Sequence, residues 1–401
     1  MLRTTKLAKT WILWLLIITV AVRLPTMFGF KRSGWDEHAY AFFAHTLDER
    51  GIPGIRRLLQ DYATDENLRQ SPLPLRVGFI VPAMLTCKIL GGFNVNNLAW
   101  LSFVSGVALV VVGTRFAEQL AGRKIALICA VLLITSPLAV GLSRRAMQDS
   151  FTALVAITCL YFVDKCWRRR GIFDHVALGV ALSIALLTKE SLILLYPMIA
   201  FAGAYYWRGM KIPASPWLLA PLCAAPLICL LIEAWFCGGT SNLIAAYKTY
   251  AALQGTLGYT IHYEKGPWFR YLLDFLAIAP LVFIGGVIGL SAPASSDSTR
   301  QGRNLALIYF ATGILLFSQL PIINVRLVIF LDVFLRLGAT LAIAYLVAQF
   351  RGKSSISILC LTLGVLVAAD GAQFYQIFMA GNLYSPTTFL LLRAEGFYNV
   401  P

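Results

Sequence analysis

The fold is decided by residues 176–207, which read VALGVALSIALLTKESLILLYPMIAFAGAYYW. Two apolar runs, 176–188 and 191–207, flank a single charged pair, Lys189 and Glu190. Each run is slightly shorter than the ~20 residues that a helix needs to cross the hydrocarbon core, so tilted helices are expected. The stretch therefore predicts two membrane helices with a Lys–Glu pair between them.

The same pattern recurs along the whole chain of 401 residues. Hydrophobic residues make up 58% and charged residues 13%, where a soluble globular chain carries about 25% charged residues. The sequence therefore predicts an all-α integral membrane protein, a polytopic helical bundle without a sizeable soluble domain. Further uncharged runs of nearly membrane length lie at 89–114, 125–143, 212–232, 275–296 and 304–325.

Lysines and arginines set the predicted orientation, because cytoplasmic loops of membrane proteins concentrate them. Basic residues precede the first apolar run, 11–22, which predicts an uncleaved first helix with its N-terminus in the cytoplasm. The later basic loops can all be cytoplasmic if the chain crosses about 11 times (range about 10–13). Residues 77–92 are then a partly inserted element, because a full crossing there would reverse every later loop. These basic loops are 115–124, 164–175, 208–211, 297–303 and 351–353.

The crossings predict one transmembrane domain, 1–369, with external loops at 31–76 and 233–274 and an external tail, 370–401. Within the first loop, residues 55–62 (IRRLLQDY) are predicted to lie on the membrane surface as an amphipathic helix. A short chain without glycosylation-heavy loops favours the bacterial inner membrane over the endoplasmic reticulum.

The net charge of +15 does not indicate a nucleic-acid partner, because positive loops of a membrane protein explain it. No glycine-rich phosphate loop lies between a strand and a helix, so a soluble nucleotide substrate is not expected. The eight cysteines and four histidines lack the spacing of a disulfide framework or a metal site.

Charged residues interrupt the apolar runs at one predicted depth, the outer membrane face. Ionisable groups at membrane depth are costly and usually face a cavity or a partner. We therefore expect these residues to form one polar site, although helix-end anchors and mutual salt bridges would give the same pattern. They are Asp36, Glu37, Arg144, Arg145, Asp149, Lys189, Glu190 and Arg326.

The acidic members can act as a general base or hold a divalent cation, and the basic members can bind phosphate. A guanidinium binds phosphate as a fork, and a lysine binds it as a point charge. Neighbouring residues on a helix point about 100° apart. Only one of Arg144 and Arg145 is therefore expected to face the site.

The order of these elements resembles the membrane glycosyltransferases of the GT-C fold, in particular the protein O-mannosyltransferases and the lipid A aminoarabinose transferases. The resemblance covers roughly residues 10–345 and rests on a series of short motifs. Two departures are Ser71-Pro72-Leu73-Pro74, where the family often has His-Pro-Pro, and the lack of a large soluble domain. The motifs are Arg23, Asp36-Glu37 with Tyr40, Ser71-Pro72-Leu73-Pro74, Ser136-Pro137, Ser143-Arg144 with Asp149, Thr188-Lys189, the stretch 266–271 and Arg326-Leu327.

The resemblance implies transfer of a sugar from a polyprenyl-phosphate donor on the extracytoplasmic side, with Asp36 as base and inversion at the sugar. Glu37 and Asp149 complete the predicted catalytic set. The predicted donor and substrate contacts are Tyr40, Arg144, Arg145, Lys189, Glu190 and Arg326.

Several alternatives stay open at this point. A Mg²⁺ or Mn²⁺ site built from Asp36, Glu37 and Asp149 is the alternative to a metal-free base, in which case no cofactor is required. A transporter or lipid flippase with a charged outer site is the rival function, although no internal repeat is visible in the sequence. A catalytically silent scaffold that binds the lipid-linked sugar is another. The acceptor is a glycan, a lipid or a protein, and the sequence does not choose among them.

Overall fold

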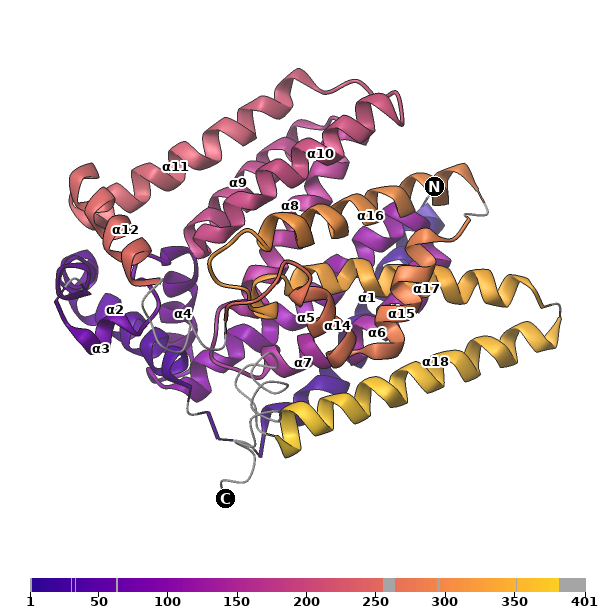
Figure 1. The fold of residues 1–401 in the computed structure, drawn as a ribbon, viewed down its shortest axis with the longest axis horizontal. Helices are drawn as coiled ribbons and strands as arrows, with labels where there is room; N and C mark the ends of the chain where they lie inside the picture. Colours follow the sequence, from indigo (N-terminus) through magenta and orange to yellow (C-terminus); the bar gives the residue numbers. More distant parts are fainter. Residues whose placement is uncertain are drawn as a thin grey trace.

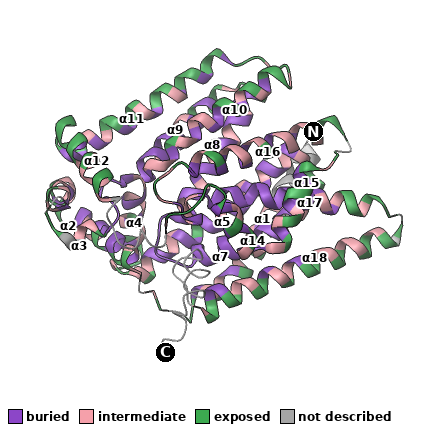
Figure 2. Cartoon of the chain, in the orientation of Figure 1, coloured by how far each residue is buried: buried purple, intermediate pink, exposed green. Residues whose placement is uncertain are grey.

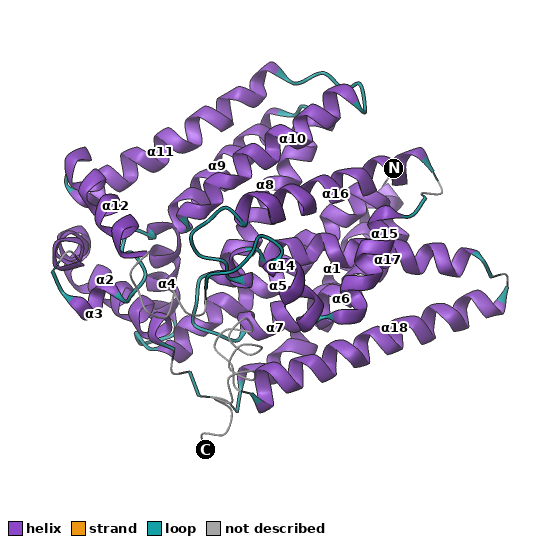
Figure 3. Ribbon diagram, viewed as in Figure 1, coloured by secondary structure: helices purple, strands orange, loops and turns teal. Residues whose placement is uncertain are grey.

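The computed structural model describes residues 2–381, apart from residues 30, 33, 63, 255–263, 294–295 and 351. The regular secondary structure of this described part consists of helices joined by loops, with no strand, as Figure 3 shows, and the predicted all-α fold is confirmed. Residues 382–401 of the predicted tail lie outside the described residues.

The α-helices are α1 (Leu2–Arg23), α2 (Trp35–Tyr62), α3 (Glu66–Arg69), α4 (Val77–Ile89), α5 (Val95–Ala121), α6 (Arg123–Thr135), α7 (Pro137–Ser143), α8 (Asp149–Arg168), α9 (Ile172–Thr188), α10 (Leu195–Arg208), α11 (Leu219–Cys237), α12 (Thr240–Gln254), α14 (Arg270–Ile278), α15 (Pro280–Ser291), α16 (Asp297–Phe317), α17 (Asp332–Ala348) and α18 (Lys353–Phe374). Short helical turns flank them: η1 (Leu24–Met27), η2 (Glu190–Leu194), η3 (Pro216–Leu218), η4 (Val325–Leu327), η5 (Ile329–Leu331) and η6 (Tyr375–Ala380).

Six of the described helical segments are long and apolar enough to cross a membrane. A further candidate is α6 with α7, which meet at a bend of 53°. Helices α4, α9 and α15 are apolar but shorter. The chain is therefore an integral, multi-pass helical membrane protein.

The first predicted external segment, 31–76, is mostly helical rather than a loop. Helix α2 carries Asp36 in its first turn and continues through a kink at Gly51. Gly51 has a φ of 60°, where a side chain would be strained, so this turn residue bends the helix instead of ending it. Residues 55–62, predicted as an amphipathic helix, form the second half of α2.

The helix connections gather at two opposite ends of the bundle. Figure 1 shows the N-terminus and the α10–α11 and α17–α18 connections toward one end, on the right of the view. Helices α2, α3 and α12 lie toward the other end. The connections at the first end include the basic stretches 208–211 and 351–353. The long helices therefore run between a basic end and an end formed by α2, α3 and α12.

The core of the bundle lies around α8 and α17, which are mostly buried, whereas α1, α11 and α18 are mostly exposed (Figure 2). The exposed face of the outer helices carries large apolar side chains, among them Leu231 on α11 and Leu361 on α18. In a bilayer such side chains contact lipid tails, which are as apolar as they are. The outer helices thus have the surface expected of membrane-spanning segments.

A buried arginine fixes the end of α1 against the break between α6 and α7. Pro137 has no backbone N–H, so the carbonyl of Leu133 loses its intrahelical donor. The Nη2 of Arg23 takes that place and donates to Leu133 O at 2.6 Å, while its Nη1 donates to Gly106 O at 3.1 Å. This contact sets the point from which the chain leaves α1 and enters α2.

A second buried arginine joins α17 to α18. The Nε of Arg336 donates to Asp332 at 2.7 Å, and its Nη1 donates to Asp370 at 2.6 Å. The guanidinium also donates to the carbonyl of Leu132. The two ion pairs compensate these buried charges, whereas Arg336 Nη2 has no hydrogen-bond partner among the described residues.

Helices α15 and α17 approach closely because glycines face each other across their contact. A Cβ at Gly289 would overlap the carbonyl oxygen of Gly338, so no side chain fits there without moving one helix. At Gly364 on α18, by contrast, an added Cβ would meet nothing within 4 Å.

We expect Gly289→Ala to destabilise the fold, because overpacking a close contact typically costs about 1–3 kcal/mol. Gly364→Ala is the matched control and should be neutral or slightly stabilising, since alanine favours helix by about 0.5–1 kcal/mol. Thermal unfolding of the detergent-purified variants, followed by tryptophan fluorescence, measures both effects. An unchanged midpoint for Gly289→Ala would contradict the close approach of α15 and α17.

Candidate active site

A cavity of about 850 Å³ lies where several helices begin or end. Its wall is formed by the start of α2, the segment 70–76, the turn before α8, the α9–η2 junction, α12 and the segment 320–327. Six of the predicted site residues are at this cavity or bonded to a residue that lines it. They are Asp36, Lys189, Glu190 and Arg326, which line it, Asp149, which is bonded to two of them, and Tyr40, which is bonded to the lining residue Arg76.

Arg326 lies between two carboxylates from different helices. Its Nε donates to Asp149 Oδ2 at 3.0 Å, and its Nη2 donates to Asp36 Oδ2 at 3.2 Å. Lys189 Nζ donates to the other oxygen of Asp149 at 3.3 Å. The side chain of Asp149 is 0% exposed, whereas that of Asp36 is 26% exposed. Asp36 is therefore the carboxylate of this pair that a bound molecule can reach.

Glu37 connects α2 to the turn between α7 and α8 instead of facing the cavity. Its Oε1 accepts from the backbone N–H of Ala146 at 2.9 Å, and its Oε2 accepts from the N–H of Gly34 at 2.9 Å. Arg145 Nη1 lies 3.4 Å from the same Oε2. Glu37 is fully buried, so these bonds hold Asp36, the preceding residue, at a fixed position.

The two neighbouring arginines point to different places, in keeping with the expected divergence. Arg145 bonds Glu37, whereas Arg144 Nη1 lies near Met379 Sδ at 2.7 Å, with its guanidinium over the ring of Phe374. Neither arginine is among the described residues that line the cavity. The structure therefore does not bring them to the place where it brings Lys189 and Arg326.

Arg76 is a site residue that sequence reasoning missed. It forms a fork with Glu190, with both N–O distances 3.1 Å, and donates to Tyr40 OH at 3.0 Å and Tyr250 OH at 2.9 Å. Arg76 and Tyr250 line the cavity, while Tyr40 lies buried behind Arg76. The sequence did contain a signal for this residue: Arg76 lies directly before the apolar run 77–92, at the same predicted outer boundary as the other charged residues of the site.

A polar pair holds the segment that carries Arg326. Asn324 donates to Glu264 Oε1 at 2.7 Å and accepts from the backbone N–H of Arg326 at 3.1 Å. The N–H of Ile323 also donates to the backbone carbonyl of Glu264 at 2.7 Å. Glu264 belongs to the predicted external segment 233–274, of which residues 255–263 lie outside the described part.

Part of the cavity lining is apolar. It is formed by side chains from η2 and from the segment after α16. The same cavity therefore offers cations, carboxylates and hydrocarbon. The apolar residues are Ile193, Leu194, Leu320, Pro321, Ile322 and Leu327.

The positions of Asp36, Glu37 and Asp149 bear on the predicted alternative of a metal site. Among the described residues, no group of three or more His, Cys, Asp or Glu side chains is placed to hold a metal ion. Asp36 and Asp149 meet the same guanidinium, and Glu37 is turned toward backbone amides. The three carboxylates therefore do not converge on one point.

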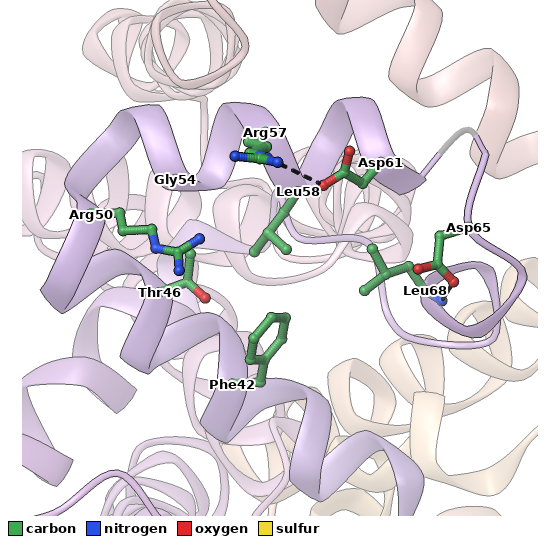
Figure 4. A pocket seen from close by; sticks show the side chains of 9 residues that line it. All are labelled: Phe42, Thr46, Arg50, Gly54, Arg57, Leu58, Asp61, Asp65 and Leu68. Atoms are coloured by element: carbon green, nitrogen blue, oxygen red, sulfur yellow. Dashed lines mark hydrogen bonds and ion pairs between the residues drawn. The ribbon is translucent and has the colours of Figure 1, made fainter.

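A second pocket, of about 480 Å³, lies between the two halves of α2 and α3 (Figure 4). Its charged side chains include Arg57 and Asp61, 3.9 Å apart, and both are well exposed to solvent. Exposed ion pairs of this kind contribute little and are screened. This pocket is a solvated surface feature and not a candidate for chemistry.

Comparison with known proteins shows a similar fold. A family model described as dolichyl-phosphate-mannose-protein mannosyltransferase matches residues 77–235, less than half of the chain. ArnT from Cupriavidus metallidurans bound to undecaprenyl phosphate superposes with a TM-score of 0.58 at 16% identity, covering 90% of this chain and 64% of ArnT. No curated protein matches the sequence.

Two structures of the Archaeoglobus fulgidus oligosaccharyltransferase are also similar. The complex of this protein, AglB, with an inhibitory peptide and a dolichol-phosphate has a TM-score of 0.60 at 12% identity, covering 92% of this chain and 56% of AglB. The complex with Zn and sulfate has a TM-score of 0.59 at 14% identity, covering 90% and 52%. The fold is that of the GT-C membrane glycosyltransferases. The resemblance drawn from the sequence is thus confirmed, and the chain spans between half and two thirds of these relatives' length.

Lys189 gives the site a pH dependence that can be measured with undecaprenyl phosphate as probe. Burial lowers the pKa of Lys189, and Asp149 opposes that shift. The charge of Lys189 is lost as the pH rises through its lowered pKa. If Lys189 contacts the phosphate of the probe, binding should therefore weaken at a lower pH than it would if this lysine were exposed to solvent. Lys189→Arg keeps its charge and should shift the alkaline loss of binding to higher pH.

Lys248→Arg, a change at an exposed lysine of α12, should leave the pH profile of binding unchanged. If Lys189→Arg and the unmodified protein lose binding at the same pH, Lys189 does not contact the phosphate.

Proposed function

We propose that the protein transfers a sugar from a polyprenyl-phosphate donor to an acceptor hydroxyl at the extracytoplasmic face of the membrane. The observation that carries the proposal is that one cavity is lined both by Lys189, Arg326 and Asp36 and by a set of apolar side chains. A lipid phosphate has the same two parts, an anionic head and a hydrocarbon chain. The relatives solved with undecaprenyl phosphate and dolichol-phosphate are consistent with this donor class.

In the proposed reaction Asp36 takes the proton of the acceptor hydroxyl, and the hydroxyl oxygen attacks the anomeric carbon. The bond to the phosphate oxygen breaks, and the polyprenyl phosphate leaves with the electron pair, so the anomeric configuration inverts. Lys189 and Arg326 stabilise the charge that develops on the leaving phosphate. A single positioned donor of this kind is typically worth about 2.7–4 kcal/mol.

The remaining predicted residues support this set. Glu37 and Arg145 position Asp36 through the turn before α8, and Asp149 holds Lys189 and Arg326 in place. Arg76 and Glu190 close the cavity wall next to Lys189 and are placed to contact the sugar. Arg144 does not line the cavity, and its carbonyl accepts a hydrogen bond from Arg32 at 3.0 Å.

The proposed topology has the N-terminus in the cytoplasm and about 11 crossings. Helix α8 leaves the site end, α9 returns to it, α10 leaves and α11 returns, so the basic connections fall at the opposite end. Helix α4 starts beside the site, where Gly78 meets Thr188, and is not counted as a crossing. Residues 1–369 then form one transmembrane domain.

This topology places the catalytic side chains outside the cytoplasm. A bacterial inner membrane is the proposed location, and the sugar and the acceptor are left open.

Asp36→Asn tests the proposal directly. A general base typically contributes about 10²–10⁴-fold, so transfer from a polyprenyl-phosphate sugar should fall by at least about 100-fold. Binding of undecaprenyl phosphate should be kept, because Lys189 and Arg326 remain. The measurement is transfer of radiolabelled sugar in membranes, with binding measured on the purified variant.

Asp297→Asn, an exposed carboxylate at the start of α16, is the control and should keep full activity. A scaffold or a flippase would tolerate Asp36→Asn, so retained activity of that variant in cells would overturn the transferase assignment.

A further inference from the structure

The carboxylates of Asp36 and Asp149 come from the first turns of two helices that are far apart in the sequence, and they share one positive group. The two nitrogens of Arg326 that hold them are different, Nε for Asp149 and Nη2 for Asp36. The guanidinium is mostly buried, and Asn324 fixes the backbone that carries it. Two acids bridged by one fixed cation is the arrangement that a divalent metal ion creates in other sites.

We propose that Arg326 takes the place of a divalent cation in this site, and that removing its side chain turns Asp36 and Asp149 into a metal-binding pair. For its catalytic meaning the inference rests on the proposed function. It adds that transfer is independent of metal because the bridging charge is built into the chain.

Charge balance supports the assignment. Asp36 and Asp149 carry two negative charges, and Arg326 and Lys189 carry two positive charges within 3.3 Å of them. A divalent ion added to this set would leave it with an excess of two positive charges at a largely buried position, which is costly. Replacing Arg326 by a divalent ion leaves an excess of one positive charge instead of two, which is the less costly arrangement.

The ligand supply points the same way. Mg²⁺ needs about six oxygen ligands at short distance and is usually held by one or two carboxylates together with waters. Two other acids near the pair are engaged: Glu37 by backbone amides and Arg145, and Glu190 by the fork of Arg76. The related oligosaccharyltransferase was solved with Zn and sulfate, whereas no group of three metal-ligand side chains occurs among the described residues here.

A guanidinium at position 326 can also contact the leaving phosphate while it holds the two carboxylates. It carries five N–H donors in a planar fork, so it can bind two carboxylates and a phosphate together. The same side chain then holds Asp36 and contacts the leaving phosphate. Lysine, as a single point charge, cannot bridge the carboxylates in this way.

The test is Mn²⁺ binding to the purified full-length protein, measured as loss of the free-ion signal in electron paramagnetic resonance. The unmodified protein and Asp36→Asn should give the same weak background. Arg326→Ala and Arg326→Met, which keeps more of the side-chain volume, should gain one Mn²⁺ site at least tenfold tighter than that background. The added change Asp149→Asn should remove the new site.

Two outcomes would overturn the proposal. The first is a stoichiometric Mn²⁺ site in the unmodified protein that Asp36→Asn removes. The second is the absence of any new site in Arg326 variants whose thermal midpoint shows that they are folded. If both variants fail to fold, the comparison of the unmodified protein with Asp36→Asn decides alone. No arm uses a sugar donor, so this result is separate from the turnover of Asp36→Asn.

Discussion

The structure depends on the neutralisation of two acids at membrane depth by one guanidinium. An uncompensated charge there costs several kcal/mol, so Asp36 and Asp149 require a partner. Arg326 meets both, at 3.2 and 3.0 Å. The three residues come from the start of α2, the start of α8 and the segment after α16. Their ion pairs therefore hold these parts of the bundle in place relative to one another. The cavity exists because the helix ends meet around this charge.

The rest of the bundle supports that meeting point. Arg23 replaces the N–H that Pro137 lacks and so ties the end of α1 to α6, while Glu37 ties α2 to the turn before α8. Apolar residues of η2 and of the segment after α16 line the same cavity, of about 850 Å³, as the charged residues. An amphiphilic donor fits such a space better than a soluble sugar nucleotide, because its anionic head group can contact the charged residues and its hydrocarbon chain the apolar residues.

The sequence predicted the fold class and much of the site, for a simple reason. A charge inside an apolar run is so costly in a membrane that Asp36, Asp149, Lys189 and Arg326 could be expected together without a structure. Arg76, Asn324 and Glu264 were missed, because they lie in connecting segments whose placement is set by tertiary contacts such as the fork to Glu190. The adjacent arginines diverge as expected, but which of them faces Glu37 depends on the turn geometry after α7. Outside the predicted helix 55–62, the helical character of 31–76 was missed because Gly51 and Pro53 usually end a helix, whereas here they kink it.

The central claim is that one cavity binds a lipid phosphate. The charged residues of the cavity bind the phosphate, and its apolar residues contact the hydrocarbon chain of the lipid. The most direct measurement is the structure of the detergent-purified protein with undecaprenyl phosphate, determined by electron cryomicroscopy. The account predicts phosphate density within hydrogen-bond distance of Lys189 and Arg326, with the chain leaving along Ile193 and Leu320. Phosphate bound instead beside Arg144, or at the basic connections on the opposite face, would contradict it.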